Sequence, residues 1–220
     1  MICIPRQFKR ILLTALLAVY TVTAMSQHKK SKPVVAKPID AKPISFQLAD
    51  FYHKTNESGI VFNFPVGYRE LPAVNNDDFS YDYAMEIPGQ EFEVWFLVKS
   101  QKTNWSDYER YKNDPTKSIG HPDSLYIQIG HAEASGFMGD QPYFTRNISK
   151  DVLKRYNADA GKSYLLNLED MTVTKHYKYA LLLTLQKNHI GTILAVCFAN
   201  EKSPEFFKNV NRMSRYIKFK

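Results

Sequence analysis

The sequence predicts an α+β fold, in which a mainly antiparallel β-sheet has helices packed on it. Segments 80–100 and 177–199 each have the pattern of two strands around a turn, because apolar residues alternate and turn residues interrupt them. Segment 203–217 carries apolar residues at helical spacing behind a capping serine. Strands, then helices, then strands and a final helix are typical of this class.

Residues 1–26 have the features of a Sec-type signal peptide. Basic side chains precede an apolar run at 11–22, and Ala24 and Ser26 offer the small side chains that cleavage requires. The run is short for a membrane span, and an uncleaved N-terminal anchor is the alternative. We therefore expect an exported protein, periplasmic or extracellular, with no transmembrane anchor after cleavage.

Residues 27–43, QHKKSKPVVAKPIDAKP, are predicted to form a Lys/Pro-rich flexible tether. Proline fixes φ and removes backbone donors, so three Lys-Pro pairs at five-residue intervals favour an extended, unpacked segment. The remaining 44–220 is long enough for one hydrophobic core and is predicted to be a single globular domain.

The net charge of +7 comes from the ends of the chain, since the leader contributes +3 and the tether +4. Residues 44–220 hold 21 basic and 21 acidic side chains, which disfavours nucleic acid as a partner. Within them, 44–140 sum to −8 and 141–220 to +8. If the two halves present separate faces, the protein could dock a charged partner.

The first predicted strand is GIVFNFP, where Ile60, Phe62 and Phe64 alternate between Gly59 and Pro65. The hairpin SYDYAMEIPGQEFEVWFLVKS follows, turning at Pro88-Gly89. One face of the pair is predicted to carry Tyr81, Tyr83, Met85, Ile87, Phe92, Val94, Phe96 and Val98. Acidic residues mark the opposite face as solvated near the turn, namely Asp82, Glu86, Glu91 and Glu93.

The closing hairpin joins YKYALLLTLQ to IGTILAVCFA through KNH. Both faces are apolar, which predicts central strands that are covered on each side. Small side chains on one face leave room for a helix, namely Gly191, Ala195, Cys197 and Ala199. Cys197 is the single cysteine that remains after cleavage, and we expect a buried apolar side chain.

That helix has Ser203 as N-cap, Pro204 at its first position and Glu205 in its first turn. Its apolar stripe is predicted to comprise Phe206, Val210, Met213 and Ile217.

Segment 103–172 is less regular. NWSDYERYKND predicts a short helix that ends before Pro115. DSLYIQIGHAEASGFMG has helix and strand features in competition, and SKDVLKRYNADAG predicts a helix capped by Ser149 that stops near Gly161.

Both ends of the domain resemble the PsbP-like (Mog1/PsbP-like) family. SGIVFNFPVGY is similar to its opening strand, and the closing hairpin with the helix ending MSRYIKF is similar to its end. The resemblance implies an α/β/α sandwich and a non-enzymatic accessory or binding role, and it supplies no catalytic residues. A photosystem role is not expected, because the leader is not a Ser-rich transit peptide.

Two Gly-His pairs ten residues apart are each followed by an acid, which gives His121, Asp123, His131 and Glu133 as candidate ligand-binding residues. In a helix the two histidines would be rotated by about 80°, and in an extended chain they would be roughly 33 Å apart. Neither arrangement favours a shared metal or an acid–base pair. We therefore predict no metal site, no cofactor and no catalytic residue.

Two further polar segments are candidates. NADAG offers Asn157 and Asp159 as a ligand-contacting corner, although a helix stop is the simpler interpretation. NNDDF at 75–79 has oxygen ligands for Ca²⁺ but lacks the spacing of an EF-hand, so a solvated turn is favoured.

The leading functional hypothesis is an exported, non-enzymatic domain that binds a protein or cell-envelope component. A carrier of a small apolar ligand or lipid is the alternative, and a hydrolase with a His-acid pair comes third. A cavity of several hundred Å³ lined by Phe and Tyr would favour the carrier.

Overall fold

The computed structural model describes residues 44–139 and 141–220. The predicted leader (1–26) and tether (27–43) lie outside the described residues and remain predictions. Within the described part, every helix is too short or too polar to span a bilayer.

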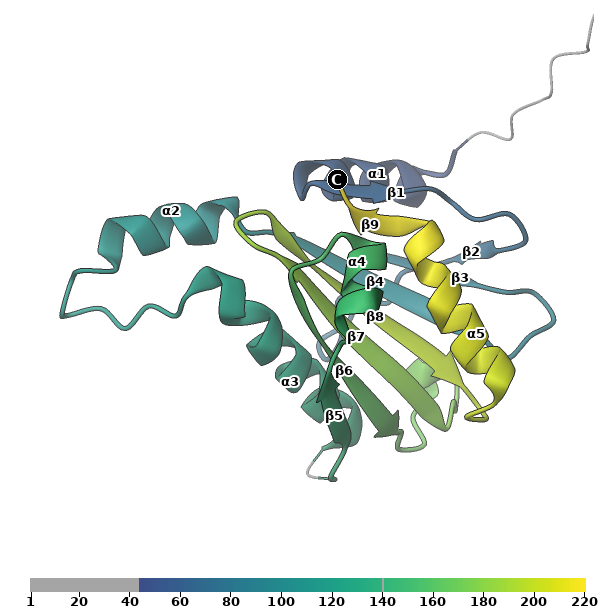
Figure 1. Ribbon diagram of the computed structural model, residues 1–220. Helices are drawn as coiled ribbons and strands as arrows, with labels where there is room; N and C mark the ends of the chain where they lie inside the picture. The colour runs from purple at the N-terminus through teal and green to yellow at the C-terminus, as the bar shows by residue number, and fades with distance from the viewer. Residues whose placement is uncertain (1–43, 140) are drawn as a thin grey trace, which may run out of the picture. The chain divides into compact units, whose positions relative to one another are not determined.

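Seven antiparallel strands form the main sheet in the order β2-β3-β4-β8-β7-β6-β5 (Figure 1). Strands β1 and β9 pair separately with each other. The strands are β1 (Ile60–Phe62), β2 (Arg69–Leu71), β3 (Tyr83–Glu86), β4 (Glu93–Ser100), β5 (Phe144–Asn147), β6 (Ala160–Asn167), β7 (Tyr179–Lys187), β8 (Gly191–Ala199) and β9 (Ile217–Phe219). The helices are α1 (Phe46–Glu57), α2 (Lys102–Tyr111), α3 (Leu125–Met138), α4 (Lys150–Tyr156) and α5 (Pro204–Arg212), with 3₁₀ turns at Pro122–Ser124, Thr172–Thr174 and Met213–Arg215. The predicted α+β class is confirmed.

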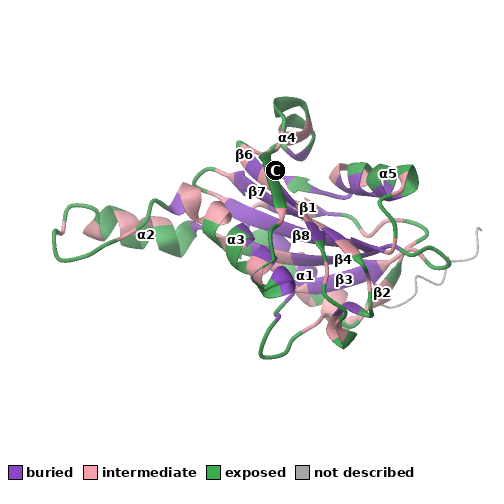
Figure 2. Cartoon of the chain, turned by 90° about the horizontal axis from the view of Figure 1, so that it is seen from below, coloured by how far each residue is buried: buried purple, intermediate pink, exposed green. Residues whose placement is uncertain are grey.

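Each face of the main sheet has its own hydrophobic cluster. The first cluster lies beneath α1, α4, α5 and the β1–β9 pair, and it includes Phe51, Phe62, Phe96, Met213 and Ile217. The second lies beneath α3 and includes Trp95, Phe137, Leu182 and Phe198. Figure 2 shows the buried strands between these layers, whereas α2 extends away from the sheet and has no buried residue.

The β3–β4 hairpin has the predicted inner face but not the predicted outer face. Tyr83 lies opposite Phe96 and Met85 opposite Val94, all in the first cluster. Tyr81 precedes β3 and belongs to the second cluster instead. The opposite face is covered rather than solvated at Glu93, because the second cluster packs on that side.

Glu93 is 2% exposed, and its carboxylate accepts hydrogen bonds from Trp95 Nε1 and Lys175 Nζ, both at 2.7 Å. Its prediction as a solvated residue was therefore wrong. Two donors satisfy the buried charge, which is the condition under which a carboxylate is tolerated inside a protein.

The closing hairpin confirms its predicted role as the centre of the sheet. All nine residues of β8 are buried. On the small-residue face, Ala195, Cys197 and Ala199 pack in the first cluster, where the Cys197 and Met213 sulfur atoms are 3.5 Å apart. Gly191 does not face α5, because a Cβ added to it would meet the backbone oxygen of Ser58 at the end of α1. Ser203 caps α5 by accepting a hydrogen bond from Phe206 N at 3.2 Å. The helix ends at Arg212, however, and Ile217 begins β9, because the backbone of 217–219 pairs with β1.

The irregular middle segment contains more structure than the sequence indicated. The segment with competing features is the helix α3. Helix α4 stops at Tyr156 rather than near Gly161, since Asn157 adopts the left-handed conformation with φ 52° and Gly161 already lies in β6. Helix α1 and strands β2, β5 and β6 were not predicted. The sequence did contain a signal for α1, because serine is a preferred N-cap residue. In the structure, Ser45 Oγ accepts a hydrogen bond from Leu48 N at the start of this helix.

Candidate functional site

The first candidate acid, Asp123, links three elements of the structure. Its Oδ1 accepts hydrogen bonds from Trp105 Nε1 (3.1 Å) on α2, Gln186 Nε2 (3.2 Å) on β7 and His189 N (2.9 Å) in the β7–β8 turn. The Trp105 ring stacks on His189 at 3.9 Å and meets His121 edge-on at 5.1 Å. Asp123 therefore fastens α2 to the end of the sheet, and His121 packs on the same tryptophan.

The second candidate pair lies on α3 and has different partners. Tyr143 Oη lies 2.6 Å from His131 Nδ1, whereas Glu133 accepts a hydrogen bond from Tyr81 Oη at 2.8 Å. Burial raises the pKa of Glu133, and the bond from Tyr81 opposes that shift. The two Gly-His pairs thus contact separate sets of residues. Among the described residues, no group of three His, Cys, Asp or Glu side chains is placed to hold a metal ion.

The third candidate pair, Asn157 and Asp159, lies at the corner between α4 and β6 and contacts other parts of the chain. Asn157 Nδ2 donates to Lys220 O at 2.6 Å. Asp159 accepts from Lys187 Nζ at 3.1 Å and from Asn188 N at 2.9 Å. These contacts tie the α4–β6 corner to the C-terminus and to the β7–β8 turn.

The two other groups considered from the sequence also have structural contacts. In the 75–79 turn, Asn76 Oδ1 accepts the backbone N–H groups of Asp78 and Phe79. Cys197 is fully buried, and burial raises the pKa of its thiol, which disfavours the nucleophilic thiolate.

A pocket of about 500 Å³ lies elsewhere, on the first-cluster face between α4, α5 and strands β5, β6 and β7. Most of its wall is apolar, comprising Phe144, Ile148, Val152, Tyr156, Leu165, Leu181, Leu183, Phe207 and Val210. Its polar lining residues are Arg146, Asn147, Ser149, Arg155, Ser163 and Asn211. This volume lies within the range of roughly 300–1,000 Å³ that is usual for small-molecule sites.

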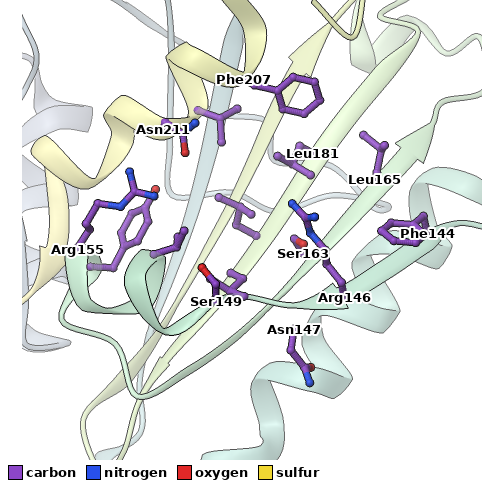
Figure 3. A pocket seen from close by; sticks show the side chains of 15 residues that line it. Phe144, Arg146, Asn147, Ser149, Arg155, Ser163, Leu165, Leu181, Phe207 and Asn211 are labelled. Atoms are coloured by element: carbon purple, nitrogen blue, oxygen red, sulfur yellow. The ribbon is translucent and has the colours of Figure 1, made fainter. Parts of the chain in front are cut away.

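Two aromatic rings of the pocket are exposed although they belong to ordered elements. Phe144 on β5 is 63% exposed and Phe207 on α5 is 38% exposed. In Figure 3, Phe144, Leu165, Leu181 and Phe207 gather on one side of the pocket, whereas Arg155 and Asn211 lie on the other. Arg146 and Ser163 lie beside the apolar group in the same view, so one end of the pocket is mainly apolar but carries Arg146, and the other end is polar.

The pocket is lined by cations without carboxylates. Arg146 and Arg155 form no ion pair within the described residues, and none of the lining residues is Asp or Glu. All of the lining residues come from 141–220, the half of the domain with a net charge of +8. The positively charged half of the domain thus supplies every residue that lines this cavity.

The sequence did not indicate this pocket. Its residues come from four separate stretches of the chain, and two of its walls, β5 and β6, were not predicted as strands. The segment 144–147 did contain a signal, because alternate residues of a strand share a face, which places Phe144 and Arg146 on the same side. In the structure these two residues pair with Leu165 and Ser163 of β6.

Among solved structures, the chain is similar to the solution structure of cyanobacterial PsbP (CyanoP) from Synechocystis sp. PCC 6803. The match has 11% sequence identity and a TM-score of 0.40, and it covers 74% of this chain and 88% of that chain. No family model and no curated protein matches the chain. At this identity and TM-score, no family, ligand, partner or site residue is transferred to this chain.

Proposed function

We propose that the chain is a non-enzymatic binding domain that holds a small apolar or amphiphilic ligand in the pocket between α4, α5 and the sheet. The observation that carries this proposal is the cavity of about 500 Å³ with a mainly apolar wall and exposed aromatic rings at Phe144 and Phe207. Protein interiors are normally close-packed, so an unfilled apolar space of this size indicates a site for a ligand.

The apolar wall is expected to supply the affinity. Burying a ligand methylene contributes about 0.8 kcal/mol, so affinity should rise with chain length until the cavity is full. The polar rim would set the orientation of the ligand, as a few convergent polar groups do in most ligand sites. In this proposal the six candidate residues from the sequence stabilise the fold rather than contact the ligand.

A fluorescent apolar probe and a pocket-filling variant test the proposal. Binding of 1-anilinonaphthalene-8-sulfonate or a similar dye to the native protein should saturate at one site, and Leu181→Trp should abolish it by filling the cavity. Leu97→Trp is the matched control, because Leu97 is a half-buried leucine that packs on the opposite face of the sheet. Equal loss of binding in both variants, or no saturable binding in the native protein, would overturn the proposal.

The variant Phe207→Ala tests dye binding in the pocket with a smaller structural change. Phe207→Ala removes an exposed ring from the pocket rim and should weaken dye binding without lowering the thermal unfolding midpoint by more than a few degrees. Unchanged dye affinity in Phe207→Ala would show that the dye binds elsewhere.

Docking of a protein or cell-envelope partner is a second candidate, favoured by the outermost strand. All four residues of β5 are exposed, and no described residue forms a strand along its outer backbone edge. Such an edge is a template for strand addition. A photo-crosslinking residue at position 145 in β5 should then capture one specific partner, whereas the same residue at position 103 in α2 should not. Equal crosslinking at both positions would count against this candidate.

We further propose that the protein is exported through its leader, on the basis of residues 1–26. N-terminal sequencing of the protein recovered from the producing cell should begin at Gln27. An intact N-terminus in the cytoplasmic fraction would contradict export.

A further inference from the structure

The charges around the pocket define a ligand class, provided that the pocket is the binding site proposed above. Arg146 projects from the edge strand β5 opposite Ser163, and Arg155 projects from α4 (Figure 3). Neither guanidinium has a carboxylate partner among the described residues, and none of the residues that line the pocket is acidic.

The positive charge continues beyond the polar end of the pocket. A second, more open hollow shares Arg155, Phe207 and Asn211 with the pocket, and it is otherwise lined by Pro204, Lys208, Arg212, Ser214 and Arg215. Of these cations, Lys208 and Arg212 pair with Glu205, which does not line either hollow. A negative group at this end would therefore meet Arg155 and Arg215, which form no ion pair among the described residues.

The opposite end of the pocket suits a hydrocarbon chain. Phe144, Leu165, Leu181 and Phe207 gather there, and the apolar wall continues along Val152 and Leu183. The cavity of about 500 Å³ has the size of a site for one small molecule.

We propose that the pocket selects a single-chain amphiphile with an anionic carboxylate head, the chemistry of a fatty acid. Its chain would lie against the leucine and phenylalanine wall, and its head would be held by the Arg155 guanidinium, with Arg146 adding positive charge from the pocket wall. A guanidinium can donate two parallel hydrogen bonds to one carboxylate, which gives both energy and orientation.

Three probes with the same ten-carbon chain separate the head from the tail. Decanoate, 1-decanol and decyltrimethylammonium would be titrated into the native protein below their micellar concentrations, with calorimetric detection. We expect decanoate to bind at least tenfold more tightly than decanol, since a charge-assisted hydrogen bond typically contributes that much or more. Decyltrimethylammonium should bind most weakly.

The variant Arg146→Gln/Arg155→Gln assigns the preference to the two guanidiniums. It should lower the affinity for decanoate to that for decanol and leave the affinity for decanol within threefold of the native value. Arg110→Gln is the matched control on α2, outside the pocket, and should change neither affinity. Far-UV circular dichroism and the unfolding midpoint verify that each variant is folded.

The outcomes distinguish this inference from the proposed function. Equal binding of decanoate and decanol would overturn the anionic-head inference and leave the pocket as an apolar site. Binding of none of the probes, together with failure of the dye experiment, would overturn the proposed function itself. Decyl phosphate that binds tenfold more tightly than decanoate would replace the carboxylate assignment with a phosphate head.

Discussion

A single glycine decides how closely α3 approaches the sheet. A Cβ added to Gly130 would lie 2.7 Å from the Tyr164 ring and 2.8 Å from Thr184 Cγ2. Gly136 in the same helix has only Phe79 nearby, at 3.6 Å. The glycine of the second Gly-His pair, Gly130, is therefore explained by packing.

Gly130→Ala is expected to destabilise the domain by about 1–3 kcal/mol, because overpacking exceeds the gain of about 1 kcal/mol in helix propensity. Chemical denaturation monitored by circular dichroism measures this change. Gly136→Ala, the control, should be neutral or stabilising by up to about 1 kcal/mol. Equal effects of the two substitutions would contradict the packing argument.

Glu133 provides a pH-dependent test at the same scale. Burial raises its folded-state pKa, so the charged form is less favourable in the folded protein than in the unfolded chain. A carboxyl of this kind stabilises the fold when protonated and loses that contribution as the pH rises through its folded-state pKa.

Glu133→Gln should therefore be more stable than the native protein at pH 7, since glutamine is neutral and can still accept the hydrogen bond from Tyr81. The difference should shrink as the pH falls below the pKa of Glu133. Unfolding midpoints between pH 4 and pH 8 measure it, with the exposed Glu201→Gln as control. A native protein that is more stable than Glu133→Gln at pH 7 would contradict the argument.

At the scale of elements, the two helices that line the pocket, α4 and α5, each begin at a serine, but the two serines make different contacts. Ser203 caps α5 through its side chain, whereas the Ser149 side chain makes no capping hydrogen bond to α4. Both helices form walls of the pocket, so their stability bears on the proposed function.

Ser203→Ala should cost about 1 kcal/mol, the typical value for the loss of an N-cap bond. Ser149→Ala is the matched substitution and should cost clearly less. The free energy of unfolding from urea titration measures both. A larger loss for Ser149→Ala would show that the cap on α5 contributes little.

At the scale of the whole molecule, the two hydrophobic clusters share the central strands. Leu182 and Leu185 are both buried in β7, the first in the cluster beneath α3 and the second in the cluster beneath α1, α4 and α5. Because one strand contributes to both clusters, neither layer can unfold while the other keeps its sheet.

Leu182→Ala and Leu185→Ala should each cost about 2–5 kcal/mol and should each shift one common unfolding transition. With Trp105→Phe as background, Trp95 fluorescence reports one cluster and far-UV circular dichroism reports the whole domain. Coincident transitions are expected for the single domain predicted at 44–220. Two separated transitions would show two independent units.

Local patterns in the sequence predicted much of this fold. The hairpins of β3–β4 and β7–β8 were readable because alternation and turn residues are properties of neighbours in the chain. The Ser203 cap and the burial of Cys197 could be predicted for the same reason. The C-terminal end of α5 was not, because the pairing of Ile217 with Phe62 joins residues far apart in the sequence.

The candidate residues in the Gly-His pairs show the limit of such patterns. Their sequence spacing argued against a shared site, and the structure gives Asp123 and Glu133 separate partners that no spacing could reveal. The pocket could not be predicted from the sequence either, because its walls come from β5, β6, β7, α4 and α5 and no local pattern shows how these elements pack.

The sequence by itself determined the class of fold, the neutral charge of residues 44–220 and the positive charge of their second half, because these depend on composition and local order. Only the tertiary structure decided that this positive half encloses a mainly apolar cavity with Arg146 and Arg155 in its wall. Which side chains share a cavity depends on how distant strands and helices pack, and that information is not contained in any one segment of the chain.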